Sequence, residues 1–193
     1  MKKIIFYDLE TTGRSHHWDQ IIQIAAICTD ENLNVLDEMN IIGKINSFSV
    51  PDPEALLVNK ISIDSICKSN FSHYNLISEI ANKFSEWSPG IFIGYNSIKF
   101  DEEVLRNEFF KNLFDPYLTV KNNNTRVDLL DITRIANFFY PDKIKSLLNK
   151  RGSAIMKLES IANTNGIKNF TAHDAMGDTY ASLELAKLIK NRI

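Results

Sequence analysis

Cysteine, basic charge and long apolar runs are all scarce in this 193-residue chain. The two cysteines, Cys28 and Cys67, lack the spacing of metal ligands, so the sequence predicts neither a zinc site nor a disulfide framework. Cys28 follows the apolar run 24–27 and is expected to be a buried small hydrophobe. Only four apolar residues separate the N-terminal lysines from Asp8, which is too short for a signal peptide or a membrane span. We therefore expect a cytoplasmic protein without membrane contact.

The charge balance is slightly acidic, with 22 lysines and arginines against 24 aspartates and glutamates and a net charge of −2. This balance argues against strong non-specific electrostatic binding to a nucleic acid. It leaves room for a metal site, because a bound cation brings its own positive charge to a phosphate. The length and the 44% hydrophobic content fit a globular chain with a real core. We expect a single domain over residues 1–193.

The apolar pattern predicts strands first and helices later. Three early strands, at 3–9, 21–29 and 34–44, read as an antiparallel meander. The later elements are a short strand at 91–95 and helices at 51–60, 62–67, 74–87, 100–112, 129–139, 156–165 and 174–190. This order predicts an α/β fold of three layers around a mixed sheet.

Acidic residues at two distant places in the chain point to chemistry. Asp8 and Glu10 project from the same side of the first strand, and Asp178 follows His173 at the start of the last helix. Exposed acids at strand ends are common, but this pair ends a buried strand, where unpaired charge is costly. An oxygen-only cluster suits magnesium or manganese, and a histidine beside it can act as a general base. The hypothesis is metal-dependent attack of water on a phosphodiester.

Asp101 begins a predicted helix, where an acid often serves only as a cap or as a partner of the helix dipole. Glu102 and Glu103 could serve in the same way, so spacing alone does not choose among the three acids.

In the last helix, Asp174 can cap the N-terminus, which frees His173 from that duty. Ala175 and Gly177 are small and are expected to leave room for a substrate or a metal. Asp178 shares a helix face with apolar residues, and a buried carboxylate there needs a cation.

A lysine-rich segment spans residues 143–157 and contains no acid. One interpretation is a solvated loop, and the other is a basic lip beside a phosphate path. The sequence favours neither.

Eight short motifs in a fixed order carry a family resemblance. They lie at 7–11 (YDLET), 23–27 (QIAAI), 94–96 (GYN), 100–104 (FDEEV), 115–117 (DPY), 128–131 (DLLD), 165–167 (NGI) and 172–178 (AHDAMGD). The chain resembles the DEDD exonucleases, in the subgroup whose last motif carries a histidine, and within it the exonuclease I branch.

The resemblance implies a ribonuclease-H-like fold and 3′-to-5′ release of nucleoside 5′-monophosphates. It also implies two divalent metal ions, Mg²⁺ or Mn²⁺. Asp8, Glu10 and Asp178 match the ligands of the first ion, and Asp8 and Asp101 match the acids that hold the second. His173 matches the general base that deprotonates the attacking water.

Substrate contacts are implied in the same way. Glu10, with Leu9 and Thr11, would meet the terminal 3′-hydroxyl. The remaining positions, which match groups along the single-strand path or at the scissile phosphate, are Arg106, Tyr117, Arg134 and Lys157. Lys157 departs from the family, which has an arginine there, and a lysine cannot make a bidentate phosphate contact.

Single-stranded DNA is the favoured substrate, and short RNA is the alternative, because the same metal chemistry serves both sugars. A noncatalytic nucleic-acid-binding module would fit better if an acid or the histidine were missing. A monomer is favoured over a homodimer. The family's enzyme continues into domains that encircle the strand, so we expect this chain to act distributively.

Overall fold

A computed structural model describes residues 2–168, 170–171 and 174–193. Its core is a five-stranded sheet in the order β3-β2-β1-β4-β5. The strands are Lys3–Thr11 (β1), Ile21–Thr29 (β2), Val35–Ile42 (β3), Gly90–Gly94 (β4) and Thr125–Asp128 (β5). The helices are Pro53–Asn59 (α1), Ile63–Lys68 (α2), His73–Trp87 (α3), Asp101–Lys111 (α4), Leu129–Phe139 (α5), Leu158–Thr164 (α6) and Ala175–Arg192 (α7).

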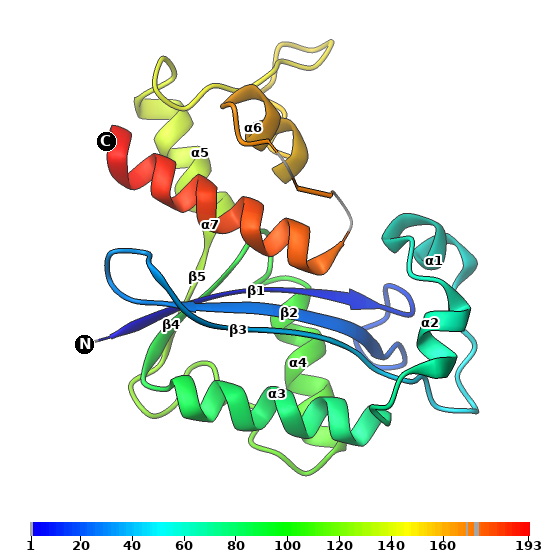
Figure 1. The fold of residues 1–193 in the computed structure, drawn as a ribbon. Coiled ribbons are helices and arrows are strands. Elements are labelled where there is room, and N and C mark those ends of the chain that lie inside the picture. Colours follow the sequence, from blue (N-terminus) through cyan, green and yellow to red (C-terminus); the bar gives the residue numbers. More distant parts are fainter. Residues whose placement is uncertain (1, 169, 172–173) are drawn as a thin grey trace.

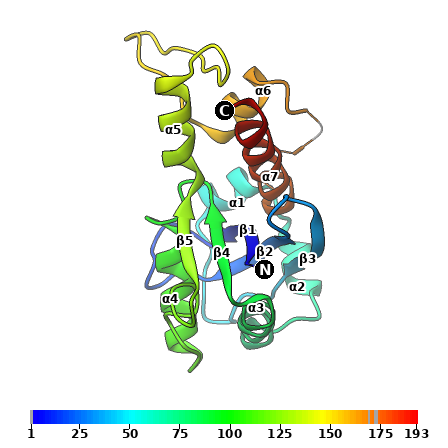
Figure 2. The same cartoon turned by 90° about the vertical axis from the view of Figure 1, so that its left-hand side faces the viewer.

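The predicted fold class is confirmed. Strands β1, β2 and β3 form an antiparallel meander, and β4 and β5 add to β1 in parallel, which makes the sheet mixed. Helices α3 and α4 lie on one face and α5, α6 and α7 on the other, while α1 and α2 stand beyond one end of the sheet (Figure 1). Figure 2 shows β4 and β5 side by side, with α5 continuing from the end of β5.

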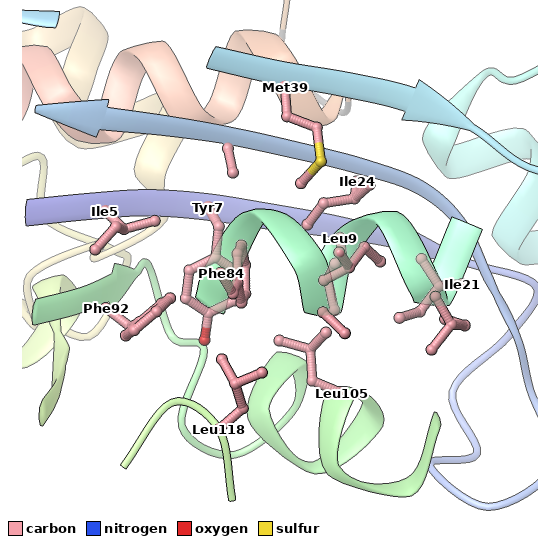
Figure 3. Close-up of a cluster of buried hydrophobic side chains, with 14 of the residues drawn as sticks. Ile5, Tyr7, Leu9, Ile21, Ile24, Met39, Phe84, Phe92, Leu105 and Leu118 are labelled. Carbon is pink, nitrogen blue, oxygen red and sulfur yellow. The ribbon is translucent and has the colours of Figure 1, made fainter. Parts of the chain in front are cut away.

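Strand β1 divides its side chains between the two faces, because successive residues of a strand point to opposite sides. Ile5, Tyr7 and Leu9 are buried in the hydrophobic cluster beneath the sheet, together with residues of α3 and α4 (Figure 3). Phe6 is buried in the cluster on the opposite face, against α7. The same alternation puts Asp8 and Glu10 on the α7 face, where the first turn of that helix passes over the end of β1 (Figure 1).

The meander and most helices lie within a few residues of their predicted ranges, and β5 is the element that the sequence did not predict. It has four residues, of which Asp128 alone is buried, so it shows neither a long apolar run nor a clear alternation. Its place comes from pairing with β4, in which Gly94 lies opposite Asp128. Cys28 is 1% exposed, which confirms that it is a buried small side chain. Within the described part of the chain, every helix is too short or too polar to cross a bilayer.

Candidate active site

Three carboxylates converge where β1 ends under α7. Asp8 and Glu10 lie near the C-terminal end of β1, and Asp178 lies in the first turn of α7. One oxygen of each carboxylate lies within 4.8 Å of an oxygen of the other two. Asp8 and Asp178, 170 positions apart in sequence, are therefore neighbours, as predicted, and a divalent cation of the kind that binds oxygen would be within reach of all three acids.

The pKa values of these acids report the cost of holding them together. Burial raises the pKa of Asp8 well above its ordinary range, and the negative charges of Asp101, Glu10 and Asp178 raise it further. Burial likewise raises the pKa of Glu10 to about 7, with smaller contributions from Asp178 and Asp174. Like charges held close in a poorly solvated place cannot all ionise unless a cation compensates them. The cluster therefore has the electrostatics of a cation site.

A fourth acid, Asp101, acts on this cluster from α4. It is 7% exposed at the start of α4, and burial raises its pKa to about 8, although the backbone N–H groups of Asp101 and Leu9 act in the opposite direction. It lies outside the group of three acids that share one point, but its charge acts directly on Asp8.

The two acids that follow Asp101, among which spacing alone did not choose, have partners outside the acidic cluster. Glu102 is buried and accepts hydrogen bonds from Tyr7 Oη at 2.5 Å, Thr119 Oγ1 at 2.8 Å and Arg126 at 3.2 Å. Glu103 pairs with Arg106 at 3.1 Å. Among the three, Asp101 alone faces Asp8, and it does not cap its helix through its side chain.

Asp128, which has no predicted role, shapes the loop that leads into α4. Its carboxylate accepts hydrogen bonds from the backbone N–H groups of Asn96 at 2.8 Å and Ile98 at 3.4 Å, and it also caps α5 through Leu130 N–H at 3.0 Å. The 95–99 loop is therefore fixed by the end of β5. An acid immediately before an apolar helix is a recognisable cap, but its reach to the neighbouring loop depends on a strand that the sequence did not predict.

The N-terminus of α7 is tied to the sheet by a second residue without a predicted role. Gln23 lies opposite Glu10 in the pairing of β1 with β2. Its amide donates to Asn40 Oδ1 at 2.9 Å and to Asp174 Oδ1 at 3.2 Å. The other oxygen of Asp174 accepts the backbone N–H of Gly177 at 3.1 Å, so Asp174 is the predicted cap.

The space beside Gly177 is already filled, so the expectation that Ala175 and Gly177 leave room for a substrate is wrong. A Cβ on Gly177 would lie 2.3 Å from the backbone oxygen of Thr171. Ala175 is fully buried. Small side chains here allow the segment before the helix to approach the helix itself. His173, the predicted general base, lies outside the described residues.

Two hollows flank the acidic cluster. The larger, of about 780 Å³, has Asp178 in its wall, and the smaller, of about 130 Å³, has Glu10 and Thr11. Val58 of α1 and Phe100 line both hollows. The two hollows therefore share part of their wall, to which α1 contributes Val58.

The candidate substrate residues divide between these hollows and other places. Arg134 and Lys157 line the larger hollow together with Asp178. Arg106 instead stacks over the ring of Tyr117 at 5.5 Å, and neither of these two is among the described residues lining the two hollows.

On β1, the side chain of Leu9 is buried in the hydrophobic cluster and faces away from the acids, so only its backbone can meet a substrate there. Thr11 is 6% exposed, and its hydroxyl donates to Gly13 O at 2.6 Å.

The lysine-rich segment also divides. Lys143 donates to the backbone oxygen of Arg192 at 2.7 Å, at the far end of α7 from Asp178, so it secures the helix terminus. Lys157 lies in the wall of the larger hollow. Neither interpretation holds for the whole segment: its beginning is structural, and its last residue lies beside the acids.

Comparisons with known proteins agree with this geometry. A family model described as Exonuclease (RNase_T) matches residues 5–186. Exodeoxyribonuclease I of Buchnera aphidicola subsp. Schizaphis graminum is 37% identical over 190 residues, which is 97% of this chain and 39% of that protein.

Solved structures give the same picture. Escherichia coli exonuclease I in complex with a dT13 oligonucleotide matches with a TM-score of 0.93 and 33% identity, over 100% of this chain and 42% of that one. The zinc-bound form of the E. coli ExoI–ssDNA complex matches with a TM-score of 0.92 and 32% identity, over 100% and 41% of the two chains. The chain thus spans about two fifths of the length of these relatives, and the predicted ribonuclease-H-like architecture is confirmed.

Proposed function

The chain belongs to the RNase_T exonuclease family, and we propose that it is a 3′–5′ exonuclease that releases nucleoside 5′-monophosphates from single-stranded DNA. The observation that carries the proposal is the convergence of Asp8, Glu10 and Asp178 beside a hollow. The relatives named exodeoxyribonuclease I and the exonuclease I structures with bound oligonucleotides support the choice of substrate. We further propose that residues 1–193 form one exonuclease domain.

The donor set of the cluster fits divalent metal ions. It offers carboxylate oxygens only, from three acids within 4.8 Å, and burial together with the neighbouring acids raises the pKa of Asp8 and of Glu10. Oxygen ligands favour Mg²⁺ or Mn²⁺, and we propose two such ions. Asp8, Glu10 and Asp178 would hold one, and Asp8 and Asp101 the other. When bound, such ions lower the pKa of a water and stabilise charge on the leaving oxygen.

The chain's own residues supply binding and proton transfer. His173 is proposed to take the proton from the water that attacks the terminal phosphate. The next residue, Asp174, caps α7 and accepts a hydrogen bond from Gln23. The bond between phosphorus and the 3′-oxygen of the next nucleotide then breaks, and the departing oxygen takes a proton from solvent water, which leaves a nucleoside 5′-monophosphate and a new 3′-hydroxyl.

Substrate binding is proposed along the two hollows. Lys157 and Arg134 line the larger hollow and would neutralise phosphates. Glu10, Thr11 and the backbone at Leu9 would meet the terminal 3′-hydroxyl. Arg106 and Tyr117 stack on each other and would contact the strand farther along its path, by charge and by base stacking.

The test is a digestion with Mg²⁺ or Mn²⁺ of matched single-stranded DNA and RNA, labelled at either end. We expect nucleoside 5′-monophosphates, loss of the 3′ label first, and DNA digested faster than RNA. Asp178→Asn should remove activity, whereas Asp64→Asn, in an exposed pair with Lys68, should not. Faster digestion of RNA would make the chain an exoribonuclease, and binding without digestion would make it a binding module.

A further inference from the structure

The loop between β1 and β2, which contributes Gly13 and Arg14 to the wall of the smaller hollow, carries an exposed tryptophan. We propose that Trp18 is a platform on which a base of the single-stranded substrate stacks. This inference rests on the proposed function and extends it to a contact outside the residues considered so far.

Trp18 is 86% exposed, whereas Trp87, the chain's second tryptophan, is 1% exposed. A single exposed apolar residue is common on a protein surface and means little by itself. What distinguishes Trp18 is the way its loop is built and the residues that lie beside that loop.

The loop is held in one conformation by Asp19. Its carboxylate accepts hydrogen bonds from Thr12 Oγ1 at 2.8 Å and from the backbone N–H of Ser15 at 2.7 Å. A Cβ on Gly13 would lie 2.5 Å from this carboxylate, so the glycine lets the Asp19 side chain pack closely against the loop. The backbone N–H of Trp18 donates to Ser15 O at 3.3 Å. Because the loop is already ordered, a base that stacks on the indole meets a surface that costs little entropy to fix.

The same loop lies against the walls of the hollows. Gly13 and Arg14 line the smaller hollow together with Glu10. The ring of His16 packs edge-on against Phe100, with ring centroids 5.1 Å apart, and Phe100 lines both hollows. With the terminal 3′-hydroxyl proposed at Glu10 and Thr11, the 3′-terminal nucleotide is the part of the substrate nearest to this loop.

Charge near the tryptophan completes the site. Arg14 is exposed and makes no ion pair with any described residue, unlike Arg106, Arg126 and Arg134. A cation for the phosphates beside an aromatic ring for the bases is the usual composition of a single-strand binding surface. Base stacking is tolerant of sequence, so the platform would add affinity without base specificity.

Intrinsic fluorescence offers a direct test, because the chain has two tryptophans and only Trp18 is accessible to solvent and substrate. A short oligothymidylate is titrated into the protein with EDTA present, so that it binds without being digested. We expect quenching of the emission, and loss of the quenching in Trp18→Phe, in which oligonucleotide affinity measured by anisotropy is largely kept because a phenyl ring also stacks.

Trp18→Ala should weaken oligothymidylate binding and raise KM by roughly 5- to 100-fold, with kcat unchanged. Phe110→Ala, which removes another exposed ring from the last turn of α4, is the matched control and should change neither value. If the wild-type chain digests DNA and Trp18→Ala binds and digests it equally well, the platform is refuted while the proposed function stands. If the wild type digests nothing, the proposed function fails first.

Discussion

The phenol of Tyr7 donates a 2.5 Å hydrogen bond to the buried carboxylate of Glu102. This bond brings together the residue that follows Tyr7 in β1 and the residue that precedes Glu102 in α4. Those neighbours are Asp8 and Asp101, which act on each other electrostatically. Burial, and then the charge of Glu102, raises the pKa of the Tyr7 phenol, so the hydroxyl keeps its proton and remains the donor. The contact joins the core beneath the sheet to the acids above it.

Replacing Tyr7 with phenylalanine removes this hydrogen bond and leaves Glu102 with Thr119 and Arg126. We expect the free energy of unfolding to fall by about 1–3 kcal/mol, because a buried carboxylate loses a partner. Metal-dependent nuclease activity should fall as well, since α4 loses one of its contacts with β1 beside Asp8 and Asp101. Chemical denaturation measures the first effect.

Tyr180→Phe is the matched control for this experiment. Its hydroxyl also donates to a carboxylate, that of Glu38 at 2.6 Å, but on the exposed surface. We expect a change within about 0.5 kcal/mol. Equal losses in the two variants would contradict the role given to Tyr7.

The acidic cluster should make the metal-free protein less stable as pH rises. Glu10 has an ordinary pKa of 4.5 and a folded pKa of about 7, and Asp101 moves from 3.8 to about 8. A raised pKa means that the folded state holds the proton more tightly, so stability is lost progressively between these two values and stays lost above them. Carboxyls whose pKa is lowered in the folded state, such as Glu108, stabilise the protein in full from about pH 5 upward. They therefore do not hide the loss of stability that the acidic cluster causes at higher pH.

Thermal unfolding in EDTA at pH 5 and pH 9 measures this dependence. We expect Tm to be lower at pH 9 by at least about 3 °C, the effect of ~1 kcal/mol in a domain of this size. Magnesium should remove this difference by raising Tm at pH 9, and Glu10→Gln should reduce it. A Tm that is flat, or that rises with pH in EDTA, would be inconsistent with the burial of these acids.

Gly177→Ala separates two opposing effects. Helix propensity alone predicts a gain of about 1 kcal/mol from alanine in α7. The added Cβ would however lie 2.3 Å from Thr171 O, a backbone atom that cannot turn away. We expect a net loss of about 1–3 kcal/mol, and a fall in kcat of about tenfold to a hundredfold as the segment before α7 shifts. A stabilised and fully active variant would show that the approach of Thr171 does not matter.

Lys157→Arg tests the phosphate contact proposed in the larger hollow. A guanidinium can bind a phosphate through two parallel hydrogen bonds, whereas an ammonium acts as a point charge. We expect KM for single-stranded DNA to fall by about tenfold, which corresponds to ~1.4 kcal/mol. Lys150→Arg, in the exposed turn outside the hollow, is the control. An unchanged KM in Lys157→Arg would remove this residue from the substrate path.

Sequence reasoning succeeded where one periodic pattern decides the outcome. The alternation of β1 separates Tyr7 from Asp8, and the face of α7 that buries Ala181 and Leu185 also carries Asp178. It failed where a position depends on contacts distant in sequence. Strand β5 exists because it pairs with β4, and no local pattern announces it.

The choice among the acids of α4 shows the same limit. Asp101 and Glu102 differ by one position, and their roles are set by Tyr7, Thr119 and Arg126, which approach from other elements. Similarly, Gly177 was expected to leave room for a ligand, whereas the chain itself occupies that room. Composition indicates that space exists, and only the fold determines what fills it.

The most direct test of the metal-dependent mechanism is the rate of nucleotide release by Asp8→Asn beside the wild type, with saturating Mg²⁺ and single-stranded DNA. The substitution keeps the shape of the side chain and removes the charge that both proposed ions share. We predict a loss of at least about a thousandfold, because stabilisation by a metal ion is worth several kcal/mol. A rate close to that of the wild type would contradict the assignment of this carboxylate cluster as the catalytic centre.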